Sequence, residues 1–420
     1  MLDPNYIREN TDKVKKGARD RGLDPKLVDQ WFEIDKRWRD LLRKVEKLRK
    51  QRNELTDEIK KAKGKPSEDK LKKGKEFREE IKKLEKKLSE VKEEWQEALM
   101  VIPNLPAGDV PVGKDESENL VVRKWREPTK FDFKPKDHLE IGENLGLIDV
   151  KRASKVSGSR FGYLTSDAVL LEFALVQFAL ETLIKEGFVP VIPPVMIKKK
   201  MEAGLGYGEH GGWNDMYILD KDDLVLVATA EHSLVARHSG EVFEAKDLPR
   251  RYVGFSSCFR REAGTYGKDT RGILRVHQFD KVEMVSFVNP KDSDKEHEYL
   301  VSLEEKLMRA LKLSYRIVKM CTGDLAQPQA RRYDLETWMP GQNKYRETHS
   351  CSNCTDYQAR RLGIKFSDGN VKNYLHILNG TVYAIGRTII AILENYQQKD
   401  GSVIVPEVLR KWVGKDRIIV

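Results

Sequence analysis

The first hundred residues carry two long stretches in which apolar residues recur at intervals of three and four. This spacing places them on one stripe of an α-helix and leaves the other faces polar. A polar turn at 64–69 separates the stretches, so we expect two helices of about 30 residues that fold back as an antiparallel coiled-coil arm. The stripe positions are Trp31, Ile34, Trp38, Leu41, Val45, Leu48, Leu55, Ile59, Phe77, Ile81, Leu84, Leu88, Val91, Trp95 and Ala98.

Beyond the arm, the pattern changes to a linker and then to short strands mixed with apolar helices. Residues 166–188 form a helix-length run that is apolar nearly all round, which predicts burial on two sides, in the core or at a subunit interface. We therefore expect an α+β protein whose larger domain has a mainly antiparallel sheet flanked by helices. Its expected parts are an N-terminal domain at 1–105 with the arm at about 30–99, a linker rich in Pro, Gly and acidic residues at 106–120, and the larger domain at 121–420.

The stretch from Cys258 to Met284 concentrates charged side chains in two strand-like runs. Between them AGTYGKDTRG is rich in glycine and small polar residues, which favours an antiparallel hairpin with a long turn. Guanidinium forks suit phosphate oxygens and an aromatic ring can stack a base, although arginines on a strand can equally form a solvated edge. Alternation along the first run predicts Arg260 and Glu262 on one face and Arg261 on the other.

Two further segments combine an apolar run with polar residues at one end. Residues 224–234 resemble a buried strand that ends in Thr229, Ala230 and Glu231, where a hydroxyl and a carboxylate can hold an ammonium group or simply face water. Residues 378–397 lead into an apolar helix with Arg387 near its start. A helix N-terminus beside an arginine favours an anion site, and the alternative is an ordinary buried helix with one surface arginine.

Composition narrows the class of protein. A chain of 420 residues with 39% hydrophobic and 34% charged residues is typical of a globular protein with two or three domains. The net charge is +10, and residues 31–100 hold 23 basic and 17 acidic residues. This excess permits contact with a polyanion, although a Lys/Glu-rich coiled coil has the same composition. No run approaches a membrane span and no leader is evident, so we expect no membrane contact and a cytoplasmic location.

The four cysteines are too few and too unevenly placed for a secreted disulfide framework, which favours a reducing compartment. Cys351 and Cys354 form a CxxC pair, but no second closely spaced Cys/His pair is present to complete a zinc site. We expect no structural zinc and two reduced cysteines in a packed loop. The sequence also has neither a G-x-x-x-x-G-K-[ST] loop nor a G-x-G-x-x-G fingerprint, so arginines and a metal would have to hold any phosphates.

FRREAG, RGILRVHQF and KVEM, in this order within 258–284, resemble the motif 2 hairpin of class II aminoacyl-tRNA synthetases and are most similar to seryl-tRNA synthetases. The helix at 166–188 with Pro193 or Pro194 after it resembles motif 1, which builds the dimer interface of this class. Residues 378–397 resemble motif 3, and YDLETWMPGQNKYRETHSCSNCTDYQARR is similar to the family's segment before it. The coiled-coil arm is similar to the arm with which this family grips tRNA.

The resemblance implies a role for each matching residue. It assigns catalysis to Arg260, Glu262 and Arg387, and it implies Mg²⁺ at Glu347 and Ser350, whose oxygens suit a hard cation. The implied ATP contacts are Arg260, Arg261, Glu262, Arg275, Val276, Phe279, Glu347, Thr348, His349, Ser350 and Arg387. The implied serine contacts are Thr229, Ala230, Glu231, Arg260, Glu283, Asn379 and Thr381. Thr348 and His349 stand where family members commonly have two serines or a close variant.

The implied activity is ATP-dependent attachment of L-serine to tRNA(Ser) through a seryl-adenylate, by a homodimer. Two alternatives stay open. Another class II enzyme, or a relative that passes an activated amino acid to a protein carrier, would have little use for the arm. A non-catalytic RNA-binding or scaffold relative would be free to lose site residues, whereas the acidic and arginine positions are all retained here.

Overall fold

The computed structural model describes residues 1–61, 66–263, 271–369 and 371–419. The chain forms two compact units. The smaller unit is Leu2–Pro103, and the larger unit is Asn104–Val420 together with Met1. Among the described residues, no helix is long and apolar enough to cross a membrane. The glycines expected at 264 and 267 in the hairpin turn, and Gly64 in the turn of the arm, lie outside the described residues.

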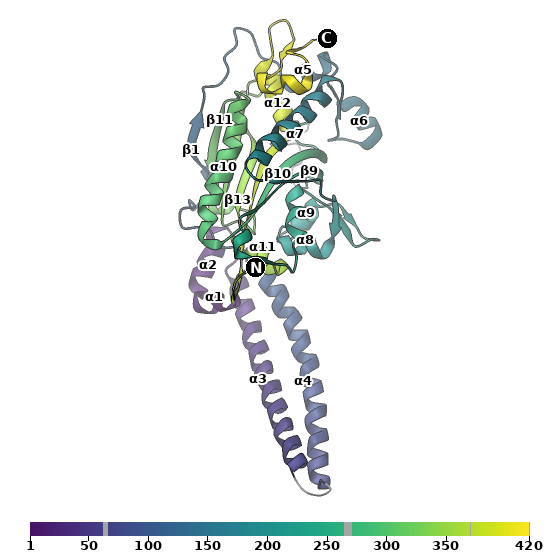
Figure 1. Ribbon diagram of the computed structural model, residues 1–420, viewed down its shortest axis with the longest axis vertical. Coiled ribbons are helices and arrows are strands. Elements are labelled where there is room, and N and C mark those ends of the chain that lie inside the picture. The colour runs from purple at the N-terminus through teal and green to yellow at the C-terminus, as the bar shows by residue number, and fades with distance from the viewer. Residues whose placement is uncertain (62–65, 264–270, 370, 420) are drawn as a thin grey trace. The chain divides into compact units, whose positions relative to one another are not determined.

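The smaller unit consists of helices, of which the last two form the expected antiparallel pair (Figure 1). Ion pairs between these two helices join Arg37 to Glu94, Arg49 to Glu85 and Lys70 to Glu58. The residue numbers rise on one helix as they fall on the other, so the helices are antiparallel. The helices are α1 Pro4–Glu9, α2 Thr11–Asp20, α3 Lys26–Lys61 and α4 Glu68–Met100.

The apolar stripe packs as the spacing predicts, with one charged residue inside it. The ring of Trp95 in α4 stacks on that of Trp38 with 5.3 Å between the ring centroids, and its centroid lies 6.1 Å from that of Trp31. Asp35 is fully buried beside them, where Trp95 Nε1 donates to it at 2.9 Å and Arg8 of α1 forms an ion pair at 2.6 Å. Burial alone would raise the pKa of Asp35, but the hydrogen bonds from Arg8 and Trp95 outweigh it and lower the pKa. This contact fastens α1 to the base of the arm.

The larger unit is built on an eight-stranded sheet in which every neighbouring pair is antiparallel except β4 and β9. This agrees with the expected α+β class. In spatial order the strands are β1 Leu120–Trp125, β11 Tyr315–Lys319, β12 Arg331–Met339, β13 Lys344–Asn353, β16 His376–Ala384, β10 Gln278–Val288, β9 Arg250–Phe259 and β4 Val189–Val191.

Helices pack against this sheet and enclose the main apolar core (Figure 1). Helix α10 (Ser293–Ala310) covers one face, where Glu304 and Met284 close in on Gly380 of β16. The opposite face of β10 presents Phe279, Lys281 and Glu283, because side chains alternate along a strand. Helices α7 (Asp167–Lys185) and α12 (Ile385–Tyr396) complete the core, and α12 follows β16 without a loop.

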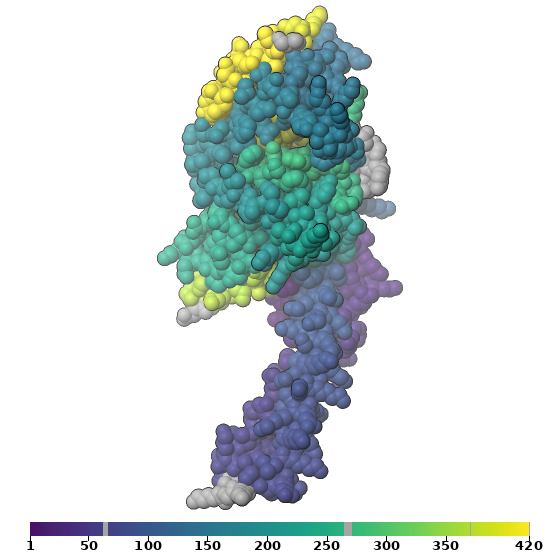
Figure 2. All heavy atoms as spheres, turned by 90° about the vertical axis from the view of Figure 1, so that its right-hand side faces the viewer, coloured from purple at the N-terminus to yellow at the C-terminus, as the bar shows by residue number. Residues whose placement is uncertain are grey.

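Shorter elements surround the sheet, and Figure 2 shows the side of the larger unit that carries α6, α8 and α9. The remaining helices are α5 His138–Asn144, α6 Val150–Ser157, α8 Lys199–Leu205, α9 Ala230–Ala236, α11 Tyr357–Leu362 and α13 Arg410–Val413. The remaining strands are β2 Ile148–Asp149, β3 Tyr163–Leu164, β5 Met196–Lys198, β6 Ile218–Leu219, β7 Leu224–Leu226, β8 Val242–Glu244, β14 Lys365–Asp368, β15 Val371–Tyr374, β17 Val403–Ile404 and β18 Arg417–Ile418.

Two local predictions were wrong. The strand expected to reach Glu231 ends at Leu226, because Thr229 accepts a hydrogen bond from Glu231 N–H and caps helix α9. The first run of the hairpin ends at Phe259, so Arg260 and Glu262 lie beyond the strand. Alternation along a strand therefore does not explain how these two side chains point.

Candidate active site

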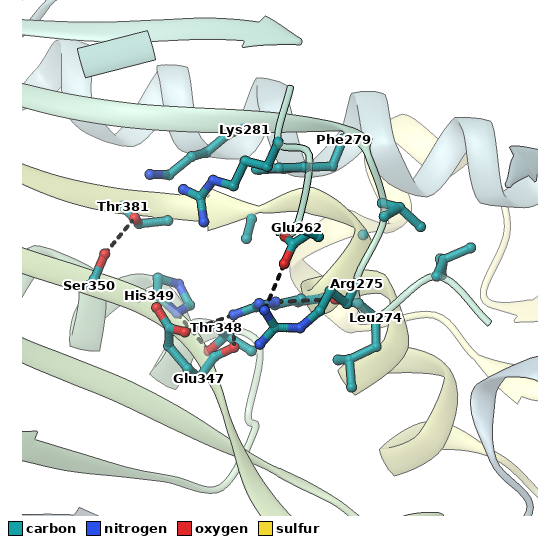
Figure 3. Close-up of a pocket in the computed structure, with 16 residues that line it drawn as sticks. Glu262, Leu274, Arg275, Phe279, Lys281, Glu347, Thr348, His349, Ser350 and Thr381 are labelled. Atoms are coloured by element: carbon teal, nitrogen blue, oxygen red, sulfur yellow. Dashed lines mark hydrogen bonds and ion pairs between the residues drawn. The ribbon is translucent and has the colours of Figure 1, made fainter. Parts of the chain in front are cut away.

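A pocket of about 560 Å³ opens on the sheet face that α10 leaves free (Figure 3). Its walls come from the β9–β10 hairpin, β13, β16 and the start of α12. The lining residues are Arg260, Glu262, Ile273, Leu274, Arg275, Val276, Phe279, Lys281, Glu347, Thr348, His349, Ser350, Thr381, Ala384, Gly386 and Arg387. The residues expected to contact ATP thus come together here, except that Arg261 does not line the pocket.

Arg260 is held on three sides. Its backbone N–H donates to the carbonyl of His277 at 2.9 Å, and His277 Nδ1 donates to the carbonyl of Arg260 at 3.0 Å. Its Nε donates to the carbonyl of Ala228 at 3.3 Å, and its guanidinium lies 5.3 Å from the centre of the Phe279 ring. These contacts fix the direction of the guanidinium fork before any ligand arrives.

Glu262 enters the pocket through an unusual backbone conformation. Its φ is +54°, in the left-handed region that costs a residue with a side chain about 1 kcal/mol or more. Its carboxylate pairs with Arg275 Nη1 at 2.7 Å (Figure 3). Arg261 instead lies over the ring of Tyr217, at 5.7 Å. The left-handed residue, and not strand alternation, separates the directions of Glu262 and Arg261.

Glu347 connects two arginines on the other side of the pocket. One carboxylate oxygen accepts from Arg387 Nη1 at 3.0 Å and the other from Arg332 Nη2 at 3.1 Å. Burial would raise the pKa of Glu347, but Arg387 and Arg332 outweigh it and lower the pKa to about 2. The carboxylate is therefore ionised at any working pH, and it keeps Arg387 pointing into the pocket.

A β-bulge brings the two expected magnesium ligands to one side of β13. Glu336 pairs with Glu347 and Leu335 with His349, so Thr348 is the extra residue and Ser350 faces the same way as Glu347. An ionised carboxylate and a hydroxyl fit the oxygen preference of Mg²⁺. Within the described residues no group of three or more His, Cys, Asp or Glu is placed to hold a metal, so phosphate oxygens would have to complete the coordination.

Thr348 and His349 sit deeper, each only 1% exposed. Thr348 Oγ1 lies 2.7 Å from Thr337 Oγ1 and 2.8 Å from His349 Nδ1. Burial lowers the pKa of His349 to about 3, so its ring is neutral. The two residues form a buried polar wall of the pocket.

A second pocket of about 860 Å³ adjoins the first and gathers most of the expected serine contacts. The two pockets share Arg260, Lys281, Glu347 and Ser350. The second is also lined by Tyr207, Gly212, Asp215, Met216, Ala228, Thr229, Glu231, His232, Glu283, Ala326, Gln329, Arg332, Ser352 and Asn379. Thr381 lines only the first pocket, and Ala230 is fully buried and lines neither.

Glu231 provides the second pocket with a buried negative charge and is 3% exposed. Tyr207 Oη donates to its Oε1 at 3.0 Å, and Gln358 Nε2 donates to the same oxygen at 3.0 Å. Both partners are neutral in this arrangement, so the carboxylate is oriented without being neutralised. A buried carboxylate held in this way is suited to an incoming ammonium group.

Glu283 forms part of the floor of the second pocket and is 1% exposed. It lies directly across from Thr381 in the β10–β16 register and pairs with Lys281 Nζ at 2.6 Å. Burial raises the pKa of Glu283, against the opposing effects of Lys281 and Thr381. Lys281 also donates to Thr229 Oγ1 at 3.1 Å, which links this floor to the start of α9.

Several site residues were missed by sequence reasoning. Lys281 precedes Glu283 by two positions, so strand alternation was a usable signal for it. Tyr207, Gln358 and Arg332 come from other elements, and only the fold brings them to the site. Cys351 and Cys354 are buried and are not joined in a disulfide, and Cys354 Sγ accepts from Asn379 Nδ2 at 3.9 Å.

Comparison with known proteins agrees with this geometry. A family model described as the tRNA synthetase class II core domain (G, H, P, S and T) matches residues 217–396, which include every lining residue of the first pocket, so this part of the larger unit is a class II synthetase core. A second model, the seryl-tRNA synthetase N-terminal domain, matches residues 1–106.

Whole-chain relatives narrow the class further. A serine--tRNA ligase of Dictyoglomus thermophilum is 44% identical over 100% of this chain and 99% of its own. The crystal structure of seryl-tRNA synthetase from Pyrococcus horikoshii complexed with ATP superposes with a TM-score of 0.95 at 43% identity, covering 100% and 99% of the two chains. The crystal structure of a cytoplasmic serine-tRNA ligase from Naegleria fowleri in complex with AMP superposes with a TM-score of 0.89 at 33% identity. It covers 100% of this chain and 98% of its own. The chain belongs to the seryl-tRNA synthetase family, which confirms the fold and the family that the resemblance implied.

Proposed function

We propose that this enzyme attaches L-serine to tRNA(Ser), using ATP, through a seryl-adenylate. The observation that carries the proposal is the junction of the two pockets at Arg260. One side offers a buried carboxylate for an ammonium group, and the other offers arginines for phosphates. Both named relatives with bound nucleotide, one with ATP and one with AMP, belong to the same family.

In the first step an oxygen of the serine carboxylate attacks the α-phosphorus of ATP in line, and pyrophosphate leaves. Glu231 and Thr229 hold the serine amine, while Glu283, Asn379 and Thr381 surround its side chain. Arg260 contacts both the serine carboxylate and the α-phosphate, so it aligns the two and stabilises the charge that builds during attack. No side chain acts as a nucleophile.

The nucleotide lies in the first pocket. Phe279 stacks on the adenine, Glu262 accepts from its amino group, and Val276 contributes to this side of the pocket. Arg275 and Arg387 hold the β- and γ-phosphates, for which they exchange their present partners Glu262 and Glu347. Mg²⁺ held by Glu347 and Ser350 would supply further neutralisation of phosphate charge. Thr348 and His349 complete the proposed set of ATP contacts, which leaves out Arg261 because its side chain lies over Tyr217.

In the second step a terminal ribose hydroxyl of tRNA takes the seryl group from the adenylate, and AMP leaves. The arm at about 30–99, within the N-terminal domain 1–105, binds tRNA outside the anticodon. Basic residues outnumber acidic residues within 31–100, and this excess of positive charge supports the assignment. Residues 106–120 link this domain to the catalytic domain at 121–420.

The active form is a homodimer, and the location is the cytoplasm. The support for a dimer is an exposed apolar face on α7 and the strands after it. Phe173 is 56% exposed, Ile184 is 50% exposed and Ile192 is 86% exposed, which is costly for a face that stays in water. Phe173→Glu should shift the sedimentation coefficient towards that of a monomer. The four cysteines are buried and form no disulfide in the described part of the chain, which supports a reducing compartment.

The test of the activity is serine-dependent exchange of labelled pyrophosphate into ATP, run with all twenty amino acids and followed by tRNA aminoacylation. We expect exchange with serine and transfer to tRNA(Ser). Exchange with another amino acid, or serine transfer to a protein carrier alone, would reject the proposal.

Replacing residues 36–95 by a short linker isolates the role of the arm. Aminoacylation should fall steeply while pyrophosphate exchange persists, because the residues of both pockets lie beyond the arm. Equal loss of both activities in folded protein would contradict this division.

A further inference from the structure

A tight turn before β6 lies against the start of the hairpin loop. His210 and Gly211 have φ values of +52° and +93°, and the short 3₁₀ helix Gly212–Asp215 follows. A side chain at Gly212 would place its Cβ 1.8 Å from the carbonyl oxygen of Tyr207, so only glycine fits there. The turn therefore has one well-defined path, and Asp215 is its last residue.

Asp215 accepts two hydrogen bonds from the residues on either side of Glu262. Its carbonyl accepts from Arg261 N–H at 2.8 Å, and its Oδ1 accepts from Ala263 N–H at 3.0 Å. Glu262 between them is the residue with φ +54°. An unfavourable conformation persists only where its surroundings impose it, and these two bonds fix both neighbours of the strained residue.

The same turn also lines the second pocket, to which Tyr207, Gly212, Asp215 and Met216 contribute. Tyr207 holds Glu231, and Asp215 holds the backbone around Glu262. One segment thus supports a carboxylate on the serine side and a carboxylate on the nucleotide side.

We propose that Asp215 is a positioning residue for ATP, acting through Glu262. By bonding the peptides before and after Glu262, it aims that carboxylate at the amino group of the adenine. The inference rests on the proposed function and assigns Asp215 a part in the preference of the enzyme for ATP. The proposal predicts a specific defect. Without the Asp215 carboxylate as acceptor for Ala263 N–H, the Glu262 carboxylate is no longer oriented towards the adenine, and the adenine amino group loses its hydrogen-bond acceptor.

The test compares ATP with purine riboside triphosphate, which lacks the amino group, in serine-dependent pyrophosphate exchange. Asp215→Ala should raise the KM for ATP about five- to tenfold, the scale of one lost hydrogen bond, with little change for the analogue. The preference for ATP should shrink accordingly. Asp215→Asn keeps an oxygen acceptor at the same place and should restore the preference to within about twofold.

Two further variants isolate the mechanism. Asp222→Ala removes an exposed aspartate of the following turn and should leave the preference unchanged. In a Glu262→Ala background, which removes the acceptor for the adenine amino group, Asp215→Ala should cause no further loss of preference, because both act on one contact. If Asp215→Ala does not fold, as judged by its thermal unfolding, Asp215→Ser is measured in its place, since its shorter side chain cannot reach Ala263.

The possible outcomes separate the two claims. Wild-type enzyme without serine-dependent exchange would overturn the proposed function. Wild-type exchange, with an unchanged preference for ATP in Asp215→Ala or in its replacement Asp215→Ser, would overturn only the role of Asp215. A defect that Asp215→Asn does not rescue, or that adds fully to Glu262→Ala, would also reject it.

Discussion

The two pockets differ in how they hold their carboxylates. In the proposed nucleotide pocket each carboxylate is paired with an arginine, Glu262 with Arg275 and Glu347 with Arg387. In the proposed serine pocket Glu231 is held by neutral donors, and Glu283, whose pKa is raised by burial, pairs with Lys281. On the proposed function, the first pocket opens its arginine pairs to admit phosphates, whereas in the second Glu231 is oriented in advance by neutral partners. This difference suits the proposed ligands. ATP carries several negative charges into the first pocket, whereas serine in the second pocket must be recognised by a single hydroxyl group.

The largest expected effect tests where the pockets meet. Arg260→Lys keeps the charge but loses the fork that spans carboxylate and α-phosphate, so kcat for pyrophosphate exchange should fall by roughly 10²-fold or more. Arg261→Lys is the matched control and should do much less, because Arg261 lies over Tyr217. Equally mild effects in folded proteins would remove Arg260 from the chemical step.

A smaller effect tests how the serine pocket selects its substrate. Glu283→Gln keeps the shape of the floor but removes its charge, so serine activation should fall by about 10- to 100-fold and alanine activation much less. The ratio of kcat/KM for the two amino acids measures the effect. An unchanged ratio would assign the recognition of the hydroxyl to other residues.

The contrast between the carboxylates also predicts a difference in pH dependence. Glu283 is ionised above its raised pKa and takes up a proton as the pH falls through it, whereas the pKa of Glu347 is about 2. Lowering the pH through this raised pKa should therefore raise the KM for serine more than the KM for ATP. Glu283→Gln should lose this dependence of the serine KM, and a dependence that persists in the variant would assign the titration to another group.

The smallest effect concerns the cysteines behind the serine pocket. Cys351→Ser with Cys354→Ser should keep activity within about threefold, since the hydrogen bond that Cys354 Sγ accepts from Asn379 is weak. Elemental analysis of the purified enzyme should show no stoichiometric zinc. Zinc that is present in the wild type and lost in the double variant would overturn this view of the pair.

The regular elements of the fold were predictable because their signals are local. The stripe from Trp31 to Ala98 defined α3 and α4, and the charged runs around 258–284 located the β9–β10 hairpin. Local rules failed where the backbone leaves its regular path. Glu262 is left-handed, Thr229 turns a strand into the cap of a helix, and a bulge at Thr348 reverses the alternation that would separate Glu347 from Ser350.

The residues that position the site were less accessible to sequence reasoning. Tyr207, Asp215 and Gln358 act across long separations in the chain, and no spacing rule links them to Glu231 or Glu262. Their role follows only from the tertiary packing of short elements around the sheet. Lys281 is an exception, because alternation along a strand predicts that it lies on the same face as Glu283, two positions later.

The most direct test of the contrast between the pockets is a crystal structure with serine, Mg²⁺ and α,β-methylene ATP. The account predicts that Arg275 and Arg387 leave Glu262 and Glu347 for phosphate oxygens. It also predicts that Tyr207 and Gln358 keep their hydrogen bonds to Glu231, which binds the serine ammonium, and that Arg260 contacts both ligands. A structure in which both arginine pairs stay closed while Glu231 changes its partners would contradict it.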